Sequence, residues 1–309
     1  GESMNLGYAC INMGLNKLPK AQRVTTNRSM IRKTFDKKGL SYVSQISLQN
    51  CQDLPKILKW NIKNNFLFFR LSSNFFPWAS EYQLEELMDY HKIKQTLSFA
   101  GQIAKIHKMR ITSHPGPFNK LCSPEERVVL NTIKDLEHHG EVFDLIGLPR
   151  TPFAKINIHV GATYGDKVKA ADTFCRNFER LSDAVKTRLT VENDDKASMF
   201  STKDLYELVY QRIGIPIVHD VHHHTFCTGE LSQEEAMSLA STTWGETKPV
   251  VHYSQSRAIE HNDPKVKPQA HSDSYWEPIV TYGLNVDVMC ECKHKEVGVF
   301  KLREIMEVK

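Results

Sequence analysis

Short apolar runs alternate along this chain with longer segments in which apolar residues recur every three or four positions. The short runs are bounded by polar or turn-forming residues, which is typical of buried strands, and the longer segments have the period of amphipathic helices. Strands are expected at 5–10, 66–71, 110–113, 155–161, 188–194, 216–220, 249–253 and 286–291. Because these runs alternate with helical segments, the pattern predicts an α/β protein built as a single (β/α)8 TIM barrel.

Capping patterns place several helix starts. Ser201-x-x-Asp204 and Ser232-x-x-Glu235 each pair a hydroxyl with a carboxylate three residues later, as in a capping box, and Ser123-Pro124-Glu125-Glu126 adds a proline at the first helical position. The polar segment 254–268 has no period and is expected to be a long loop. Further helices are expected at 45–63, 83–107, 167–186, around Trp276, Ile279 and Val280, and at 296–306.

The composition fits one folded domain. With 309 residues and 40% hydrophobic content the chain can bury a large core, and we expect residues 4–309 to form a single barrel domain. Gly1-Glu2-Ser3 precede Met4 and look like a remnant of a cloning vector. The formal net charge of +4 permits nucleic-acid binding without demanding it.

The chain shows no sign of a membrane or secretory segment. It contains no apolar run long enough to span a bilayer and no charged-then-apolar leader, so membrane insertion and secretion are disfavoured. Its seven cysteines are scattered, odd in number and without zinc-knuckle spacing. We therefore expect an intracellular protein of a reducing compartment, the cytoplasm or the nucleus.

Two segments suggest contacts with nucleic acid, and each has a purely structural alternative. Between 17 and 38 there are eight Lys or Arg residues and one acid, Asp36. This segment either grips phosphates or forms an ordinary solvated loop and helix face. The loop 72–78 carries Phe75, Phe76 and Trp78, which either wedge into a base stack or, as is more common, pack against the core.

The stretch from Pro216 to His224 ends an apolar run in one carboxylate and four imidazoles. Asp220 and His223 stand three residues apart, so both side chains can reach one cavity, although any single histidine could also be a core or surface residue. Other expected strands end in the same way, and in a barrel these ends meet at one rim. The rim residues are His114, His159, Glu192, Asp220, His223, His252 and Glu291, and the loop after the seventh strand adds His271.

Five histidines and three carboxylates exceed the needs of one metal ion. They suit two or three divalent ions, with Glu192 and Asp220 central enough to bridge them. Mixed imidazole and carboxylate ligation fits Mn²⁺ or Zn²⁺, with Mg²⁺ as a further alternative, and the residues alone do not choose between them. Such clusters chiefly catalyse displacement at phosphorus. Two-metal sugar isomerases and epimerases of the same fold are the alternative from another class of enzyme.

Nine motifs, in order along almost the whole chain, resemble those of the UV damage endonuclease family and, more distantly, of the endonuclease IV type of abasic-site endonucleases. They are Gly7-Tyr8-Ala9-Cys10-Ile11-Asn12, Arg70-Leu71-Ser72-Ser73, Ser113-His114-Pro115-Gly116, His159-Val160-Gly161, Val191-Glu192-Asn193, His219-Asp220-Val221-His222-His223, Val251-His252-Tyr253-Ser254, His271-Ser272-Asp273 and Asp287-Val288-Met289-Cys290-Glu291-Cys292-Lys293. The resemblance implies a metal-dependent DNA repair endonuclease that cleaves the backbone 5′ of UV photoproducts, both cyclobutane dimers and 6-4 photoproducts, and leaves a 3′ hydroxyl. Abasic sites are a further expected substrate.

Carried over by position, the resemblance implies up to three manganese-type ions. The first would be held by His114, His159 and Glu192. The second would be held by Glu192, Asp220, His252 and Glu291, and the third by His223 and His271 with Asp273. Glu192, Asp220 and Glu291 are the expected catalytic carboxylates.

The resemblance also implies contacts with damaged double-stranded DNA, which we expect the protein to bind as a monomer. The expected contacts are Tyr8, Asn12, Asn74, Pro117 and Phe118. Tyr8 and Asn12 would face the lesion strand or its phosphate. Pro117-Phe118 stand where family members insert a Gln-Tyr pair, and an apolar wedge can still unstack bases.

Two other positions depart from the family pattern. Glu81 stands where the family has a histidine, and Val250 stands where it has a lysine. Lys248 lies on the same strand face as Val250 but is expected to be too far back to replace that lysine. These departures bear on substrate range more than on reaction type. An abasic-site endonuclease of the endonuclease IV type and a sugar isomerase remain the alternative functions.

Overall fold

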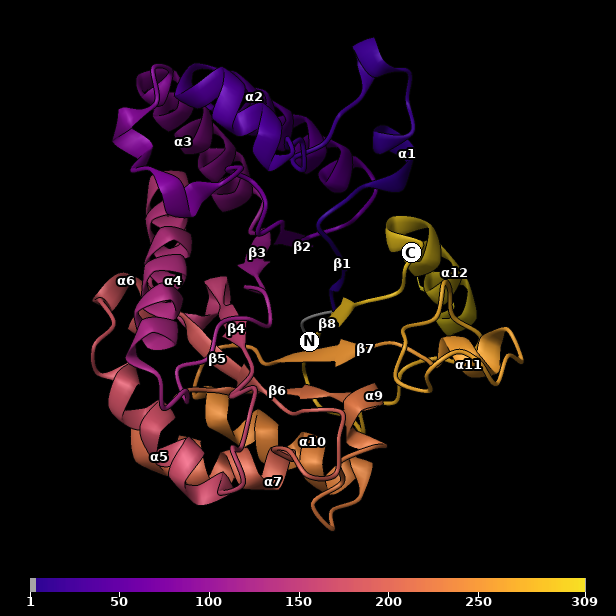
Figure 1. The fold of residues 1–309 in the computed structure, drawn as a ribbon. Coiled ribbons are helices and arrows are strands. Elements are labelled where there is room, and N and C mark those ends of the chain that lie inside the picture. The colour runs from indigo at the N-terminus through magenta and orange to yellow at the C-terminus, as the bar shows by residue number, and fades with distance from the viewer. Residues whose placement is uncertain (1–3, 309) are drawn as a thin grey trace.

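The computed structural model describes residues 4–308, and within them eight parallel strands form a closed barrel (Figure 1). The strands follow one another around the barrel in chain order, and β8 pairs with β1 to close it. The predicted TIM barrel is confirmed, while the suspected vector remnant at residues 1–3 lies outside the described residues. The strands are β1 (Leu6–Ala9), β2 (Phe68–Leu71), β3 (Arg110–Ser113), β4 (Ile156–Ile158), β5 (Leu189–Glu192), β6 (Ile217–Asp220), β7 (Val250–Tyr253) and β8 (Asp287–Cys290).

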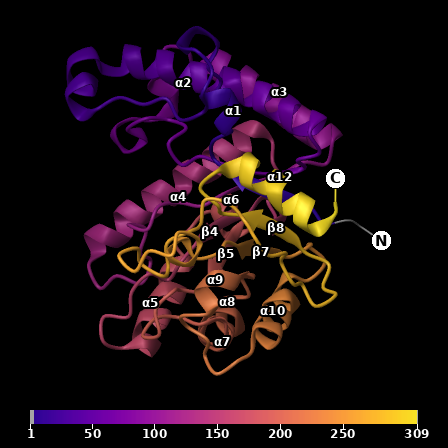
Figure 2. The ribbon, with the colours of Figure 1, turned by 90° about the vertical axis from the view of Figure 1, so that its right-hand side faces the viewer.

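Helices surround the barrel, and α2 and α3 lie side by side at one end of the molecule (Figures 1 and 2). A Cβ on Gly101 of α3 would meet the carbonyl oxygen of Ile146 in α4 at 1.6 Å, so these two helices touch backbone to backbone. The α-helices are α1 (Met13–Asn16), α2 (Arg32–Lys63), α3 (Tyr90–Ile106), α4 (Glu126–Ile146), α5 (Lys167–Phe178), α6 (Asp183–Lys186), α7 (Thr202–Leu205), α8 (Gln211–Ile213), α9 (Val221–His224), α10 (Gln233–Ser241), α11 (Arg257–Glu260) and α12 (Lys295–Met306).

The structure bears on the expectations about membrane-spanning segments and about the cysteines. Among residues 4–308, no helix is both long and apolar enough to cross a membrane. The seven cysteines all fall within this range and all are free. The reducing compartment stays a prediction.

Three expected helices have different bounds. Helix α2 begins at Arg32 rather than at 45, and it kinks at Gly39, whose φ of 66° suits a residue without Cβ. The expected helix 83–107 begins only at Tyr90, because Gln83 and Glu86 form a capping box around a separate 3-10 turn, η3 (Leu84–Glu86). The segment 167–186 forms α5 and α6 instead of one helix.

The capping predictions succeed at two sites and fail at one. Ser201 with Asp204, and Ser232 with Glu235, form the predicted capping boxes of α7 and α10. The prediction for Ser123 is wrong, because α4 begins after Glu125 and its N-cap makes no side-chain hydrogen bond. The Ser123 hydroxyl instead accepts a hydrogen bond from the backbone N–H of Glu125 at 3.1 Å.

The connection between β7 and β8 also differs from expectation. The segment 254–268 contains α11, and Ser256 pairs with His271 in an isolated β-bridge. The helix expected around Trp276 is wrong, since the described segment there is irregular. Tyr275 stacks on Tyr253 with ring centroids 4.9 Å apart and donates a hydrogen bond to its carbonyl oxygen, so tertiary contacts hold this loop.

A buried charged group lies among the amino ends of the strands. Arg110, at the start of β3, lies 3.1 Å from Asp287, at the start of β8, and also donates to the carbonyl oxygen of Lys248. The Lys248 ammonium lies 3.0 Å from the same carboxylate. Buried and paired charges therefore occupy the amino end of the barrel, opposite the carboxyl ends of the strands.

Candidate metal centre

The carboxyl ends of the strands bring the predicted ligands together. Glu192 and Asp220 are the last residues of β5 and β6, and His252 lies on β7. Among the described residues, three groups have potential ligand atoms that all lie within 4.8 Å of one another, and two of these groups lie at the barrel mouth and contain Glu192. These two are His114, His159 and Glu192, and Glu192, Asp220, His252 and Glu291. These are the first two of the three ligand sets expected from the sequence.

Glu192 lies between the two groups and presents one oxygen to each. Its Oε1 is 3.1 Å from Nε2 of His114 and 3.4 Å from Nε2 of His159. Its Oε2 is 3.2 Å from Nδ1 of His252. Asn157 donates a hydrogen bond of 2.8 Å to Oε1 and so fixes the orientation of the carboxylate. This geometry suits a carboxylate that bridges two cations.

The second group consists of buried atoms that lack hydrogen-bond partners. Within residues 4–308, Glu192 Oε2, Asp220 Oδ2, His252 Nδ1 and Glu291 Oε1 all belong to this class. A buried polar atom without a partner is costly, and three carboxylates side by side are more so. Oxygen and imidazole donors facing one point fit a divalent cation such as Mn²⁺ or Zn²⁺.

Burial and close neighbours shift the pKa values of these residues in different directions. Burial, followed by the neighbouring carboxylates of Glu192 and Glu291, raises the pKa of Asp220 well above its usual value. Burial alone would also raise the pKa of Glu192, but the histidines around it, led by His252 and His159, bring it well below the ordinary range. Burial lowers the pKa of His252 to about 4. A cation at this point would balance the excess negative charge.

Hydrogen bonds orient four of the site histidines. Nδ1 of His114 faces the carbonyl oxygen of Pro115 at 3.2 Å, and Nδ1 of His159 faces the Asp194 carboxylate at 2.8 Å. Nδ1 of His223 and of His271 lie 2.8 and 3.0 Å from the carbonyl oxygens of Asn193 and Glu291. In each ring Nε2 remains as the nitrogen available to a metal ion, as is common where an outer partner fixes the tautomer.

The third expected ligand set is only partly assembled. The rings of His223 and His271 lie 6.4 Å apart, so both reach the same side of the mouth. The expectation that Asp273 joins them is wrong, because its carboxylate faces Arg257 and lies 2.8 Å from Nε2 of His261. Asp273 instead belongs to a surface group with Glu260 and His261.

The sequence did not reveal several residues whose side chains contact the predicted ligands and fix their orientation. Asn157, Asn193 and Asp194 contact Glu192, Asp220 and His159 respectively. Arg70 and Lys155 both contact His252. The available signal was weak: a charged or amide residue inside an apolar strand run. Nothing local showed which ligand each would reach.

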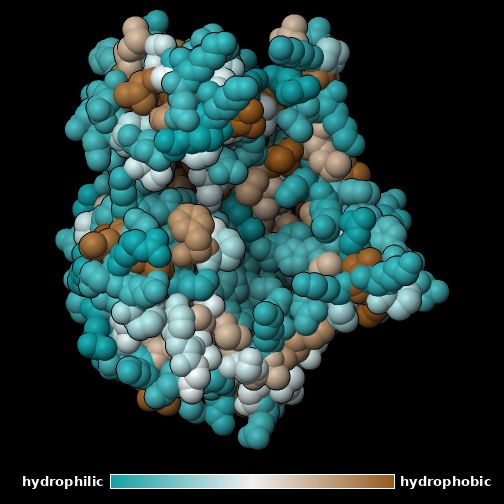
Figure 3. Space-filling view, in the orientation of Figure 1, coloured by the Kyte–Doolittle hydropathy of each residue, from teal (hydrophilic) through white to brown (hydrophobic). Residues whose placement is uncertain are grey.

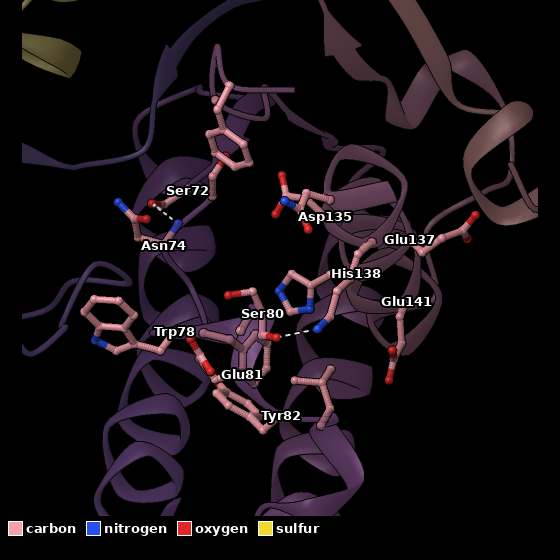
Figure 4. Close-up of a pocket in the computed structure, with 18 of the residues that line it drawn as sticks. Ser72, Asn74, Trp78, Ser80, Glu81, Tyr82, Asp135, Glu137, His138 and Glu141 are labelled. Carbon is pink, nitrogen blue, oxygen red and sulfur yellow. Dashed lines mark hydrogen bonds between the residues drawn. The ribbon is translucent and has the colours of Figure 1, made fainter. Parts of the chain in front are cut away.

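A groove leads away from the metal centre. Figure 3 shows a largely hydrophilic face that is hollowed between the helices α1 to α3 and the rest of the barrel. A cavity of about 1100 Å³ runs from His114 between the loop 72–84 and α4, and in Figure 4 the side chain of His138 points across it toward Ser80. Its outer part is lined by the carboxylates of Glu81, Asp135, Glu137 and Glu141.

Three of the expected DNA contacts lie at the surface. Phe118 is 61% exposed and lines the groove, and Pro117 beside it is exposed. Asn74 is exposed and lines the same groove. These positions leave the side chains accessible to a duplex, so their DNA contact stays a prediction.

Both Tyr8 and Asn12 have buried side chains in this structure, and their expected DNA contact stays a prediction. Tyr8 has no exposed surface, and its hydroxyl donates to Asn61 of α2. Asn12 caps α1 by accepting a hydrogen bond from the backbone N–H of Leu15. The two residues tie β1 to the surrounding helices.

The structure also shows the surroundings of the two other candidate DNA-binding segments, the loop 72–78 and the basic segment 17–38. Phe75 and Phe76 are buried, so they pack in the core rather than wedging into DNA. In the basic segment, Arg28 pairs with Asp53 at 2.8 Å, while the other lysines and arginines of 17–38 are exposed. Binding of phosphates by this segment stays a prediction.

The remaining departures from the family pattern have clear positions. Val250 is buried, and Lys248 pairs with Asp287 at the amino end of the barrel, so it does not reach the ligands. Glu81 lies 2.7 Å from Arg32 of α2 and lines the groove. It therefore lies outside both ligand groups.

Comparison with known proteins identifies close relatives. A UV-damage endonuclease of Schizosaccharomyces pombe is 36% identical over 311 residues, which cover 96% of this chain and 50% of the yeast protein. A UV DNA damage endonuclease of Clostridium perfringens is 34% identical over 312 residues, covering 96% of this chain and 69% of that protein. The chain thus spans about half the length of the yeast relative.

A solved structure also resembles this chain over almost its whole length. The crystal structure of SacUVDE matches with a TM-score of 0.84 at 29% identity, covering 99% of this chain and 98% of that one. A D-tagatose 3-epimerase-like protein, 11% identical with a TM-score of 0.58, shares the fold alone. A family model described as "UV-endonuclease UvdE" matches residues 4–309. The chain therefore belongs to the UV-endonuclease family UvdE.

Proposed function

We propose that this protein is a divalent-metal-dependent DNA repair endonuclease that hydrolyses the phosphodiester 5′ to UV photoproducts. Cyclobutane dimers and 6-4 photoproducts in double-stranded DNA are the main substrates, and abasic sites are a further one. Membership of the family supports the reaction class. The observation that carries the proposal is the placement of Glu192, whose two oxygens face two adjacent ligand groups.

The ligand groups define the roles that we propose for individual residues. His114, His159 and Glu192 would hold one Mn²⁺, and Glu192, Asp220, His252 and Glu291 a second, with His223 and His271 contributing to a third. Zn²⁺ and Mg²⁺ are the alternative ions. When bound, such ions activate water and neutralise the phosphate and the leaving oxygen. Glu192, Asp220 and Glu291 orient the attacking group by fixing where the cations lie.

The charge of the groove supports an orientation for the DNA. Its outer part carries Glu81, Asp135, Glu137 and Glu141, which would repel a phosphate, whereas its inner end meets His114. The scissile phosphodiester therefore lies at the inner end. Phe118, with Pro117, stands at the rim as an apolar wedge beside the lesion, and Asn74 contacts the DNA from the opposite loop. We propose that the protein acts as a monomer inside the cell.

The test is cleavage of three duplexes that each carry one cyclobutane dimer, 6-4 photoproduct or abasic site. Each duplex is incubated with Mn²⁺, with Zn²⁺ and with chelator, and the cut position is mapped on both strands. We expect cuts immediately 5′ of the photoproducts that require metal. Cutting only at the abasic site would instead favour an endonuclease IV type of activity.

Failure on all three duplexes would contradict the proposal and return attention to a sugar isomerase or epimerase. That alternative is tested by incubating the same metal-loaded protein with ketohexoses and following epimer formation. The open groove beside the metal centre argues against it, because a sugar enzyme needs a small enclosed pocket.

A further inference from the structure

We propose that Asn119, together with Asp135 of α4, presets the Phe118 wedge, and that both are positioning residues for damage recognition. This inference rests on the proposed function, in which Phe118 enters the duplex beside the lesion. Asn119 is only 3% exposed, so it acts through Phe118 rather than by contact with DNA.

The wedge is the tip of a β-turn. Pro117 and Phe118 are the two central residues of a turn from Gly116 to Asn119, and the backbone N–H of Asn119 donates to the carbonyl oxygen of Gly116 at 3.2 Å. Proline is favoured at the first central position, because its ring fixes φ near the value that the turn requires. Pro117 therefore restricts the backbone that carries Phe118.

The Asn119 side chain closes this turn a second time and ties it to α4. Its amide nitrogen donates to the carbonyl oxygen of Gly116 at 3.0 Å and to the Asp135 carboxylate at 2.8 Å. Asp135 lines the groove from α4 (Figure 4). The amide oxygen of Asn119 is buried and has no hydrogen-bond partner within residues 4–308, so only the two donated bonds offset the burial of this amide.

The Phe118 ring rests on the same turn. A Cβ on Gly116 would lie 3.0 and 3.2 Å from two carbons of the ring, so the ring lies against Gly116 while 61% of Phe118 stays exposed. Gly116 thus accepts both bonds from Asn119 and supports the ring. Loss of the Asn119 side chain would loosen the backbone and the ring of the wedge together.

A wedge that is ordered before binding loses little conformational freedom when it enters the base stack, so more of the stacking free energy remains as affinity. An undamaged duplex does not admit the wedge and gains nothing from this order. The two positioning residues should therefore set the ratio of the affinities for damaged and undamaged DNA.

The experiment measures this ratio by fluorescence anisotropy, in chelator, for a cyclobutane-dimer duplex and an undamaged duplex of the same sequence. A 2-aminopurine base opposite the lesion reports unstacking by its fluorescence, and circular dichroism melting checks folding. The variants are N119A, D135A, D135N, F118A and the double variant F118A/N119A. N177A is the matched control, because Asn177 also donates from its amide to this segment, at the carbonyl oxygen of Leu121 beyond the turn.

We expect N119A and D135A to lower the affinity ratio about three- to tenfold, as loss of buried hydrogen bonds would, and to reduce the 2-aminopurine signal. D135N still offers an acceptor to Asn119, so it should keep the ratio. The charge that both Asp135 variants remove acts on both duplexes alike and leaves the ratio unaffected. N177A should also keep it. F118A/N119A should match F118A alone, because Asn119 acts only through Phe118.

The inference fails if folded N119A and D135A keep the ratio of the unmodified chain, and D135A decides the matter if N119A does not fold. It also fails if N119A lowers the ratio as much in the F118A background, or if N177A lowers it as far as N119A does. A ratio unchanged in F118A would instead overturn the wedge of the proposed function. An unmodified chain without preference for the photoproduct would overturn damage recognition itself.

Discussion

The Asp194 carboxylate faces Nδ1 of His159 at 2.8 Å, and its second oxygen accepts a hydrogen bond from the backbone N–H of Phe200. Burial would lower the pKa of His159, but Glu192 and Asp194 raise it to about 9. A carboxylate behind a ligating histidine fixes the ring and strengthens it as a donor.

We therefore predict that D194N lowers DNA cleavage about 10- to 100-fold at limiting Mn²⁺, with partial recovery at high Mn²⁺. Steady-state cleavage across a Mn²⁺ titration measures this. Asn can still accept the hydrogen bond from Phe200, so the local loop is kept. A loss that is the same at every Mn²⁺ concentration would show that Asp194 does not act through the metal.

Glu192 and Asp220 should be indispensable. We expect E192A and D220A each to abolish cleavage, because each removes a central ligand. Metal binding stabilises a folded protein by about 2.7 kcal/mol when the metal is 100 times above its dissociation constant, and this gain should be lost in both variants. Melting with Mn²⁺ and with chelator measures it.

The control for these variants is E260Q, which alters a carboxylate of the surface group formed by Glu260, His261 and Asp273. Its oxygens already accept hydrogen bonds from the backbone N–H groups of Asp273 and Ser274. We expect E260Q to cleave normally. Full activity of either alanine variant would refute the assignment of the centre.

Phe118 should distinguish damaged from intact DNA. Stacking of an aromatic side chain on a base contributes about 1–3 kcal/mol, so F118A should weaken binding to a photoproduct duplex roughly tenfold. Undamaged duplex should be affected less, since no base is displaced there. Fluorescence anisotropy with inactive protein and both duplexes gives the two affinities.

F99A is the matched control for the wedge, because Phe99 is also an exposed aromatic residue but lies on α3, away from the groove. It should leave both affinities unchanged. If F118A weakens the two duplexes equally, Phe118 only contributes general contact area.

His219 should make the fold sensitive to acid. Its ring is fully buried between Thr202 and Gln233, with contacts of 2.8 and 2.6 Å. Burial lowers its pKa to about 3, whereas an unfolded histidine titrates near 6.5. Between pH 6.5 and pH 3 this histidine binds a proton in the unfolded chain but not in the folded chain. The stability of the fold is therefore complete above pH 6.5 and decreases as the pH falls toward 3.

Because of this one residue, the free energy of unfolding should decrease by about 2 kcal/mol between pH 7 and pH 5. Urea unfolding in chelator at the two pH values measures the total loss, and H219Q should reduce it by about that amount. H107Q, at an exposed histidine, should leave it unchanged. An equal acid loss in H219Q and the unmodified chain would contradict the prediction.

The barrel and the gathering of its rim residues were predictable because short local stretches of sequence indicate both. A short apolar run that ends in Asp220 or His159 signals a strand and the residue at its exit without reference to the rest of the chain. Parallel strands then bring these exits together, whatever the lengths of the helices between them.

Features that depend on distant partners were not predictable. Tyr8 stands near a strand end as the ligands do, but its ring packs among Trp60, Phe66 and Phe69 instead of facing the mouth. Trp276 lies in a segment of apolar residues at helical spacing, yet the stacking of Tyr275 on Tyr253 holds that segment as a loop. In both cases tertiary packing overrides the local signal.

Arg110, Asp287 and Lys248 fill the amino end of the barrel with paired charges, on the side away from the candidate metal ligands. In the proposed function, the metal ions and the DNA would therefore both enter from the opposite mouth. A duplex lying across that mouth would shut the ions in, so their exchange with solvent should become slow for as long as the DNA stays bound. Chelator added before the DNA would then remove the ions and prevent cleavage, whereas chelator added after the DNA would remove them only slowly.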